Sequence, residues 1–460
     1  MFLDRSDLIV HNPALLGYGV CVTDLDDDGA FEFFVAGFDC ANVVLKWNGS
    51  GYEARPHHTL AAPNRQAIGV AAADIDGDGR EELYVLNTDT FAGAKRFGDQ
   101  LFAFRDGAWC DLFTLDENVG LVNQVAGRSV AALDRRGRGR YGFFVANYGG
   151  PMRLYEILTG TRLKDAAPDA NVDFVTGGRA LVALPLVSPP GRMDVFAANE
   201  NGPNYLFQNL GDGTFDEVAA ELSLHDPFEN GRGVAVLDAD ENGRFDLCVG
   251  NWQGEHRLFL QSPLGGFLDV APPEMNRPSA IRTVLAADFD NDGYEEIFFN
   301  NIGEPNRLFA YRDGRWTRAD IGDADEPDGL GTGAAIADLD NDGRLELLIA
   351  HGEQDPQPLS LYQTAPNDND WLRVLPLTPF GAPARGAVVT LTTRTRVQRR
   401  AIDAGSGYLC QMEPVAHFGL GAARGAADPV EQVEIVWPGG ARAVIESPPV
   451  RDTLRVPHPA

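Results

Sequence analysis

Five short stretches of the sequence place acidic residues at alternate positions, ahead of a glycine and an apolar run. In one of them, "DIDGDGREELYVLN" from Asp74, acids occupy loop positions one, three, five and nine, and glycine occupies position six. Oxygen ligands at this density suit Ca²⁺, which takes about six to eight of them. The glycine permits the turn with positive φ that brings the side chains together. The pattern therefore predicts Ca²⁺ sites, which Mg²⁺ or Mn²⁺ could occupy in part.

The expected ligands come from five copies of this loop. They are Asp24, Asp26, Asp28 and Glu32; Asp74, Asp76, Asp78 and Glu82; Asp238, Asp240, Asn242 and Asp246; Asp288, Asp290, Asp292 and Glu296; and Asp338, Asp340, Asp342 and Glu346. Five copies in register argue against ordinary solvated hairpins, because neighbouring carboxylates repel one another strongly without a cation. We expect about five ions, one per copy. Their role is expected to be mainly structural, because the protein supplies the whole ligand set and leaves no open position for catalysis.

Two weaker copies keep the frame of the repeat. In "DRRGRGRYGFFVAN" from Asp134, Arg136 and Arg138 replace the second and third acids. We expect a guanidinium group to supply the positive charge there in place of a metal ion. The copy from Pro185, "PLVSPPGRMDVFAAN", has lost the acids of the loop.

The seven copies predict the architecture. They start 50, 60, 51, 53, 50 and 50 residues apart, and each contains four short apolar runs separated by glycine and asparagine turns. Four strands repeated seven times predict an all-β fold, a seven-bladed β-propeller, over residues 1–366. The seventh copy stops after its third strand, so the N-terminal segment "MFLDRSDLIVHN" is expected to add the outer strand of the last blade.

The pattern changes after residue 366. "WLRVLPL", "RGAVVTLTT" and "VEQVEIVWPGG" alternate apolar and polar residues as strands do. They predict a small β-sandwich over residues 367–460, packed alongside the propeller. "GSGYLC", from Gly405, resembles a glycine-rich phosphate loop only superficially, because no helix follows to receive a phosphate.

The chain resembles a known family in both parts. Repeats such as "DIDGDGREELYV" are similar to the FG-GAP/VCBS repeats of integrin-α-type propellers, and "GSGYLCQMEPVAHFGLG" followed by "VEIVWPGG" is similar to the ASPIC/UnbV domain. Together they resemble the cartilage acidic protein family and its bacterial homologues. This resemblance implies calcium at the acid loops, and it implies no settled activity.

Composition narrows the partners and the compartment. Acids outnumber Lys and Arg by 67 to 38, a formal charge of −29, which argues against nucleic acid as a partner. No apolar stretch approaches the roughly 18 residues that span a bilayer. The start lacks the pattern of a signal peptide, so a cytoplasmic location is expected. The alternative is a secreted or periplasmic protein from which a leader has been removed.

A candidate ligand site lies at the opposite ends of the innermost strands. Six residues before each loop start, four consecutive blades carry Arg128, Arg179, Arg232 and Arg282. Guanidinium forks suit carboxylate or phosphate, although these arginines could instead bridge to acids of neighbouring blades. His351 and Tyr18 are candidate proton donors or acceptors at the same mouth.

Two functions are compatible with this pattern. The first is a calcium-binding propeller that presents a face to a protein partner or an anionic small molecule. The second is an enzyme of lyase, isomerase or cyclase type that acts on an anionic small molecule at the arginines.

Overall fold

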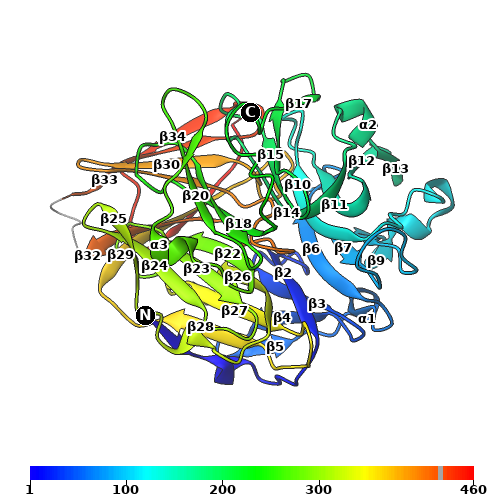
Figure 1. Ribbon diagram of the computed structural model, residues 1–460, viewed down its shortest axis with the longest axis horizontal. Coiled ribbons are helices and arrows are strands. Elements are labelled where there is room, and N and C mark those ends of the chain that lie inside the picture. The colour runs from blue at the N-terminus through cyan, green and yellow to red at the C-terminus, as the bar shows by residue number, and fades with distance from the viewer. Residues whose placement is uncertain (423–427, 460) are drawn as a thin grey trace.

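The computed structural model describes residues 1–422 and 428–459. Within them, strands form seven repeated four-stranded units, or blades, followed by two further sheets (Figure 1). The third and fourth blades join into one eight-stranded sheet, because β11 also pairs with β14. The all-β prediction is confirmed.

The blades take their strands in chain order. The first four are β2 (Gly17–Thr23), β3 (Glu32–Gly37), β4 (Val43–Trp47), β5 (Tyr52–Ala54); β6 (Ala67–Ala73), β7 (Glu82–Asn87), β8 (Gln100–Arg105), β9 (Ala108–Asp111); β10 (Gly127–Leu133), β11 (Gly142–Pro151), β12 (Arg153–Thr159), β13 (Arg162–Asp165); and β14 (Val175–Leu184), β15 (Asp194–Asn199), β16 (Tyr205–Asn209), β17 (Phe215–Glu217). The last three are β18 (Gly231–Leu237), β19 (Asp246–Asn251), β20 (Arg257–Gln261), β21 (Phe267–Asp269); β22 (Ile281–Ala287), β23 (Glu296–Asn301), β24 (Arg307–Arg312), β25 (Arg315–Arg318); and β26 (Gly331–Ala337), β27 (Glu346–His351), β28 (Ser360–Thr364), β1 (Phe2–Asp4).

The first strands of the blades form a closed ring. Each packs against the next from β2 through β6, β10, β14, β18 and β22 to β26, and β26 packs back against β2. The N-terminal strand β1 pairs with β28 from Phe2 opposite Thr364 to Asp4 opposite Tyr362. The N-terminus lies beside β28 in Figure 1. The architecture is a seven-bladed β-propeller, and β1 covers what would otherwise be an exposed strand edge.

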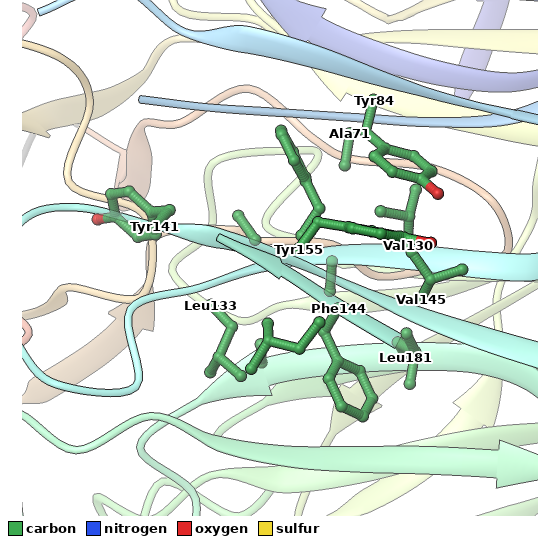
Figure 2. Close-up of a cluster of buried hydrophobic side chains, with 14 of the residues drawn as sticks. Ala71, Tyr84, Val130, Leu133, Tyr141, Phe144, Val145, Tyr155 and Leu181 are labelled. Carbon is green, nitrogen blue, oxygen red and sulfur yellow. The ribbon is translucent and has the colours of Figure 1, made fainter. Parts of the chain in front are cut away.

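Apolar side chains fill the spaces between blades. Figure 2 shows one such cluster, in which Tyr84 of the second blade and Tyr155 of the third lie near Val130 and Val145. The two tyrosine rings stack with their centroids 5.8 Å apart. Small residues predominate in the inner strands, as in "AIGVAAA" of β6, because neighbouring inner strands approach closely around the axis.

The C-terminal part forms the predicted β-sandwich. One sheet contains β29 (Asn369–Pro376), β32 (Ala416–Ala422) and β35 (Thr453–Val456), and the other contains β30 (Val388–Thr393), β31 (Val397–Ala401), β33 (Val430–Val436) and β34 (Arg442–Glu446). Leu372, Val389, Phe418, Ile435 and Trp437 belong to one buried cluster between these sheets. The alternation seen in the sequence therefore corresponds to one buried and one outer face per strand.

Helical segments are short among the described residues. They are α1 (His58–Ala61), α2 (Ala167–Ala170), α3 (Pro273–Asn276) and the 3₁₀ turns η1 (Ser6–Leu8), η2 (Leu112–Thr114), η3 (Asp116–Asn118) and η4 (Asp323–Asp325). In this part of the chain, none has the length and apolar character that crossing a membrane as a helix requires.

The sandwich lies across the acid-loop end of the propeller, whereas the sequence suggested a domain packed alongside. Gly419 N donates to Asp288 Oδ2 over 3.0 Å, and an Arg373 guanidinium nitrogen lies 3.2 Å from Asp338 Oδ2. Arg385, fully buried, places Nε 2.6 Å from Glu81 Oε1. The polar acid-loop face is thus partly covered because basic and backbone donors of the sandwich meet its carboxylates.

A segment of the sandwich also fills the propeller channel. Residues 403–412, here called the channel segment, connect β31 to β32. Gln411 N donates to Val20 O over 2.9 Å, and Gly407 and Val234 exchange two backbone hydrogen bonds of 2.8 Å. The side chain of Gln411 bonds both backbone groups of Ala72, at 2.7 and 3.0 Å. Inner strands that face the axis thereby find partners for their free backbone groups.

Candidate metal loops and an arginine-lined channel mouth

The five acid loops bring their carboxylates together. The groups are Asp24, Asp26, Asp28 and Glu32; Asp74, Asp76 and Asp78; Asp238, Asp240 and Asp246; Asp288, Asp290 and Glu296; and Asp338, Asp340 and Glu346. In each group, one ligand atom per residue lies within 4.8 Å of all the others. Each group joins the end of an inner strand to the start of the second strand, so the five groups occupy one face of the propeller.

Backbone hydrogen bonds fix the shape of each loop. In the second blade, Asp74 Oδ2 accepts from Gly79 N over 3.0 Å, and Glu82 Oε2 accepts from Ile75 N over 2.9 Å. Gly79 has φ of +93°, which a side chain would strain. The same two bonds recur in the sixth blade, from Gly293 N to Asp288 and from Phe289 N to Glu296. One oxygen of each end acid is therefore used by the loop itself.

The remaining oxygens fit a cation. Asp238 Oδ1, Asp288 Oδ1 and Glu296 Oε1 are buried and have no hydrogen-bond partner among the described residues. Burial, followed by the neighbouring acids, raises the pKa of Asp338 to about 7 and that of Asp288 well above its usual range. Buried carboxylates that must stay close and ionised at neutral pH require a positive charge, so these loops could hold metal ions.

Four expected ligands, Asn242, Asp292, Glu82 and Asp342, lie outside these groups, and other loop acids have basic partners. Asn242 Oδ1 accepts from Arg244 N and Asp292 Oδ1 from Tyr294 N, both over 2.8 Å. Glu82 lies 3.2 Å from the Arg105 guanidinium, and Asp342 pairs with Arg344 at 2.5 Å. In the first blade, Lys46 Nζ contacts Asp26, Asp28 and Glu32 at 2.7 to 2.8 Å. In the first two blades, one basic side chain of the same blade thus contacts three acids of the loop, whereas Arg312 and Arg344 contact one acid each in the sixth and seventh blades.

The third blade corrects one expectation. The guanidinium of Arg136 does not neutralise Asp134, because its Nη1 donates to the Asp212 carbonyl oxygen of the next blade over 3.3 Å. Asp134 instead accepts from the backbone N–H groups of Arg136, at 3.3 Å, and Gly139, at 2.6 Å. Backbone donors can stabilise one carboxylate without a metal ion once its acidic neighbours are absent.

β-Bulges place the four arginines at the opposite face. Gly231 pairs with Asn251 and Gly233 with Gly250, so Arg232 is an extra residue with no partner across the strand pair. The register of β10 and β22 shifts at Arg128 and Arg282 in the same way, and in β14 it shifts between Gly178 and Leu181, the stretch that contains Arg179. A bulge redirects the side chain of its extra residue. We call the end of the channel where these four side chains gather the arginine mouth.

The four guanidinium groups bridge blades and meet few acids. Glu200 contacts both Arg179 and Arg232, the latter at 3.1 Å, and Arg282 Nη2 lies 2.6 Å from Glu353 Oε1. Arg128 Nη2 donates to the Thr90 carbonyl oxygen over 3.0 Å and also to that of Phe91. These contacts are the interblade bridges that the structural interpretation expected. They still leave four positive charges against two carboxylates among the described residues.

Aromatic rings hold the guanidinium planes in place. Arg179 lies 5.1 Å from the centroid of Phe91 and 4.8 Å from that of Tyr148, and Arg282 lies 4.3 Å from that of Trp252. Phe91 is 60% exposed, so the arginine mouth has an apolar rim on one side. Stacking of this kind restricts arginine side chains without neutralising their charge.

The channel segment brings a tyrosine to the arginine mouth. Tyr408 is buried, and burial alone would raise the pKa of its phenol. The charges of Arg179, Arg282, Arg128 and Arg232 outweigh burial and lower that pKa. Tyr18 lies at the same place, where burial and then Glu353 raise the pKa of its phenol above the ordinary range. The four arginines therefore surround a phenol from the other domain.

His351 is engaged within its own blade. It is 2% exposed, its Nδ1 lies 2.8 Å from the Pro358 carbonyl oxygen, and its Nε2 lies 3.3 Å from Glu326 Oε2. A role as proton donor at the arginine mouth would require one of these contacts to break. The structure thus gathers the four arginines and Tyr18, and it gives His351 a place in the packing of the last blade.

Sequence reasoning missed Tyr408. As a possible site, its stretch suggested only a glycine-rich phosphate loop, which it resembles superficially. The available signal was composition, because "AGSGYLCQM" is apolar and small where an exposed connection of this length is usually polar. Only the docking of the sandwich on the propeller shows which side chains meet it.

A cavity of about 130 Å³ lies at the other end of the channel, under the sandwich. Its lining includes Arg400, Glu295 and Asp403. Arg400 and Glu295 lie 3.3 Å apart, and Asp403 accepts from Gly405 N and Met412 N, both over 3.0 Å. These charges are matched internally, unlike those of the arginine mouth.

The fold and the acid loops define a β-propeller of FG-GAP-like repeats with a C-terminal ASPIC and UnbV domain. The FG-GAP-like repeat family matches residues 24–85, 191–249, 238–299 and 288–349, and the ASPIC and UnbV family matches residues 380–460. The chain is 45% identical to cartilage acidic protein 1 of Xenopus tropicalis over 97% of this chain and 74% of that protein. It is also 45% identical to the Homo sapiens protein, over 93% and 70%.

The chain therefore belongs to the cartilage acidic protein family, which confirms the resemblance seen in its motifs. Among solved structures, BBS1N in complex with ARL6DN aligns with 79% of this chain and 97% of its own, at 12% identity and a TM-score of 0.47.

Proposed function

We propose that this protein is a calcium-stabilised binding protein whose ligand is an anion, free or on a protein partner, held at the arginine mouth. The observation that carries the proposal is the convergence of four guanidinium groups on one place with two carboxylates against them. In a chain with a formal charge of −29, a local excess of positive charge has a specific use. Arginine forks recognise carboxylate and phosphate oxygens.

The acid loops supply stiffness in this proposal. Ca²⁺ is the ion that best suits clustered oxygen ligands on flexible loops. It would bind the carboxylates of the five groups and hold both the blade turns and the sandwich that docks on them. The arginine mouth lies at the far ends of the same inner strands, about 20 Å away at about 3.3 Å per residue. Metal and ligand would therefore act at separate faces.

The alternative function is that of an enzyme of lyase, isomerase or cyclase type that acts on an anionic small molecule at the arginine mouth. It would need a proton-transfer group at the same mouth. His351 is held by Pro358 and Glu326, so the binding function is the better supported of the two.

The test measures anion binding by isothermal titration calorimetry at pH 7.5, with malonate and an acidic peptide as probes. Arg232→Ala and Arg282→Ala should each weaken binding at least tenfold, because each removes a charged donor. Arg257→Ala is the matched control. Arg257 lies among Asp226, Glu229 and Glu255 at 2.8 to 3.4 Å, so its charge is already neutralised.

Equal affinity in the wild type and in the two arginine-mouth variants would contradict the proposal, as would an absence of binding of both probes to the calcium-loaded protein. A loss of affinity in Arg257→Ala equal to that in Arg232→Ala would point to general electrostatics instead of a site.

A further inference from the structure

Resting on the proposed function, we infer that Tyr408 forms the floor of the arginine mouth and donates a hydrogen bond to a small dianion of the carboxylate or phosphate class. The site is then composite, because the propeller contributes the guanidinium groups and the sandwich domain contributes the phenol. This assigns to the channel segment a part in ligand recognition as well as in domain docking.

The backbone on both sides of Tyr408 is anchored. Gly407 exchanges two hydrogen bonds of 2.8 Å with Val234 of β18, and Leu409 O accepts from Val70 N of β6 over 3.3 Å. The next residue, Cys410, lies against Gly333 of β26, where an added Cβ would come within 2.8 Å of its sulfur. Three blades thus hold the segment, and Tyr408 cannot withdraw from the arginines without breaking these contacts. A floor held in this way is preorganised for a ligand.

The charge balance sets the ligand class. Four guanidinium groups face Glu200 and Glu353, so two positive charges have no counterpart among the described residues. Burial, and then the neighbouring arginines, lower the pKa of Arg179 to about 9, although Tyr408 acts in the opposite direction. The Nε atoms of all four arginines are buried without a hydrogen-bond partner in the described part of the chain. A dianion would neutralise the excess positive charge.

The phenol suits such a ligand only in its neutral form. A protonated Tyr408 can donate a hydrogen bond to an oxyanion. An ionised Tyr408 would place a negative charge among the arginines and compete with the ligand. The charged groups that act on it are the four arginines, which contact Glu200 and Glu353, and the titratable phenols beside them are Tyr18 and Tyr148. Affinity for a dianion should therefore fall as pH rises through the titration of Tyr408.

The experiment uses the full, calcium-loaded chain with malonate and inorganic phosphate as probes. Isothermal titration calorimetry is run between pH 7.5 and 10, where malonate is a dianion throughout and phosphate is mostly one. In the wild type, affinity should fall as pH rises. In Tyr408→Phe, affinity at pH 7.5 should be about three- to tenfold lower, from one lost hydrogen bond, and the part of the decline due to the phenol should vanish. Tyr205→Phe, on β16 beside Phe207, is the matched control.

A second measurement needs no variant. Phenolate absorbance of the wild type is followed against pH with and without malonate. Malonate should raise the pKa of one early-titrating tyrosine, because the ligand and the phenolate exclude each other. The Tyr408→Phe comparison assigns the shifted titration to Tyr408.

The outcomes distinguish this inference from the proposed function. If malonate or phosphate binds, and Arg232→Ala abolishes binding, but Tyr408→Phe matches the wild type at every pH, the Tyr408 inference is overturned and the binding function stands. If neither probe binds while an acidic peptide does, the small-dianion class is wrong. If malonate, phosphate and the acidic peptide all fail to bind, both the Tyr408 inference and the proposed binding function are contradicted. If Tyr408→Phe weakens binding as expected, a preference for malonate or for phosphate identifies the oxyanion.

Discussion

At the scale of single residues, the backbone N–H at the end of the second strand donates to an asparagine in three blades and to a histidine in a fourth. Asn42, Asn204 and Asn306 each accept the backbone N–H at the end of the second strand of their blade, at 2.8 to 3.0 Å. In the fifth blade, His256 Nδ1 accepts from Asn251 N over 3.0 Å. The ring is fully buried and lies 5.0 Å from Phe299. A histidine in this position must stay neutral to act as the acceptor.

This difference predicts a pH dependence that one substitution removes. Burial lowers the pKa of His256 to about 3, below its unfolded value of about 6.5. The stability that depends on neutral His256 is therefore fully present above about pH 6.5 and is lost as pH falls towards 3. The linkage amounts to about 2 kcal/mol between pH 7 and pH 5. His256→Asn, the residue of the other blades, should flatten the free energy of unfolding over this range.

Urea unfolding of both proteins at several pH values measures the effect. The substitution also removes ring packing, so the comparison concerns the slope with pH and not the stability at a single pH. Parallel slopes for the two proteins would show that His256 does not limit stability in acid.

At the scale of elements, the short strand β1 completes the last blade. Phe2 is 1% exposed, and its ring meets Phe289 edge-on with centroids 4.9 Å apart. Leu3, next to it, is 41% exposed, because successive side chains of a strand point to opposite faces. One strand of three residues therefore joins the two ends of the propeller through one buried side chain and a backbone ladder.

The strand offers a matched pair of substitutions. Phe2→Ala should lower the free energy of unfolding by about 3 to 5 kcal/mol, because it leaves a cavity beside Phe289 and Phe298. Leu3→Ala should change it by less than about 0.5 kcal/mol, as at other exposed sites. Thermal and denaturant unfolding measure both. Removal of residues 1–4 should also promote aggregation, because it exposes the edge of β28.

Similar losses of stability in the two variants would show that general disturbance, and not burial of Phe2, is responsible. Unchanged melting and solubility of the truncated chain would show that β1 does not contribute to closure.

At the scale of the whole molecule, the acid loops connect the stability of the blades to the docking of the sandwich. Asp288 accepts from Gly419 N of the sandwich, and Asp338 pairs with Arg373, which also contacts Glu413. The carboxylates proposed to bind Ca²⁺ are thus also contacts between the domains. An ion that binds only the folded chain stabilises it by about 3 kcal/mol per site at a hundredfold excess over Kd.

Removal of calcium should therefore lower the melting temperature and loosen the sandwich together. After dialysis against EDTA, we expect earlier thermal unfolding at constant ionic strength and faster hydrogen exchange in the channel segment. Elemental analysis of the calcium-loaded protein should find about five ions, one for each acid group. Asp288→Asn should remove about one of them, whereas Asp134→Asn, in the loop without neighbouring acids, should remove none.

An unchanged melting temperature after complete chelation would contradict the metal proposal. Fewer than five ions, with loss confined to the first two blades, would indicate that Lys46 and Arg105 serve in place of metal there.

The sequence by itself determined the repeat, the number of blades, the sandwich and the acid loops. These depend on local patterns: alternating strands, glycine turns and carboxylates spaced within about nine residues. It also showed the four arginines at equivalent positions, because rotation of one blade onto the next preserves their place. The sequence did not show that each arginine lies in a β-bulge, since a bulge depends on how two strands pair.

Only the tertiary structure decided what meets the arginines. Glu353 and Tyr408 lie far from Arg282 in sequence and come near it through the packing of neighbouring blades and domain docking. The sequence placed the sandwich alongside the propeller, because an alternating pattern shows which face of a strand is buried but not which surface buries it. The sequence likewise did not show that the channel segment is buried in the propeller, because its small, apolar residues are explained only by the inner strands that surround them.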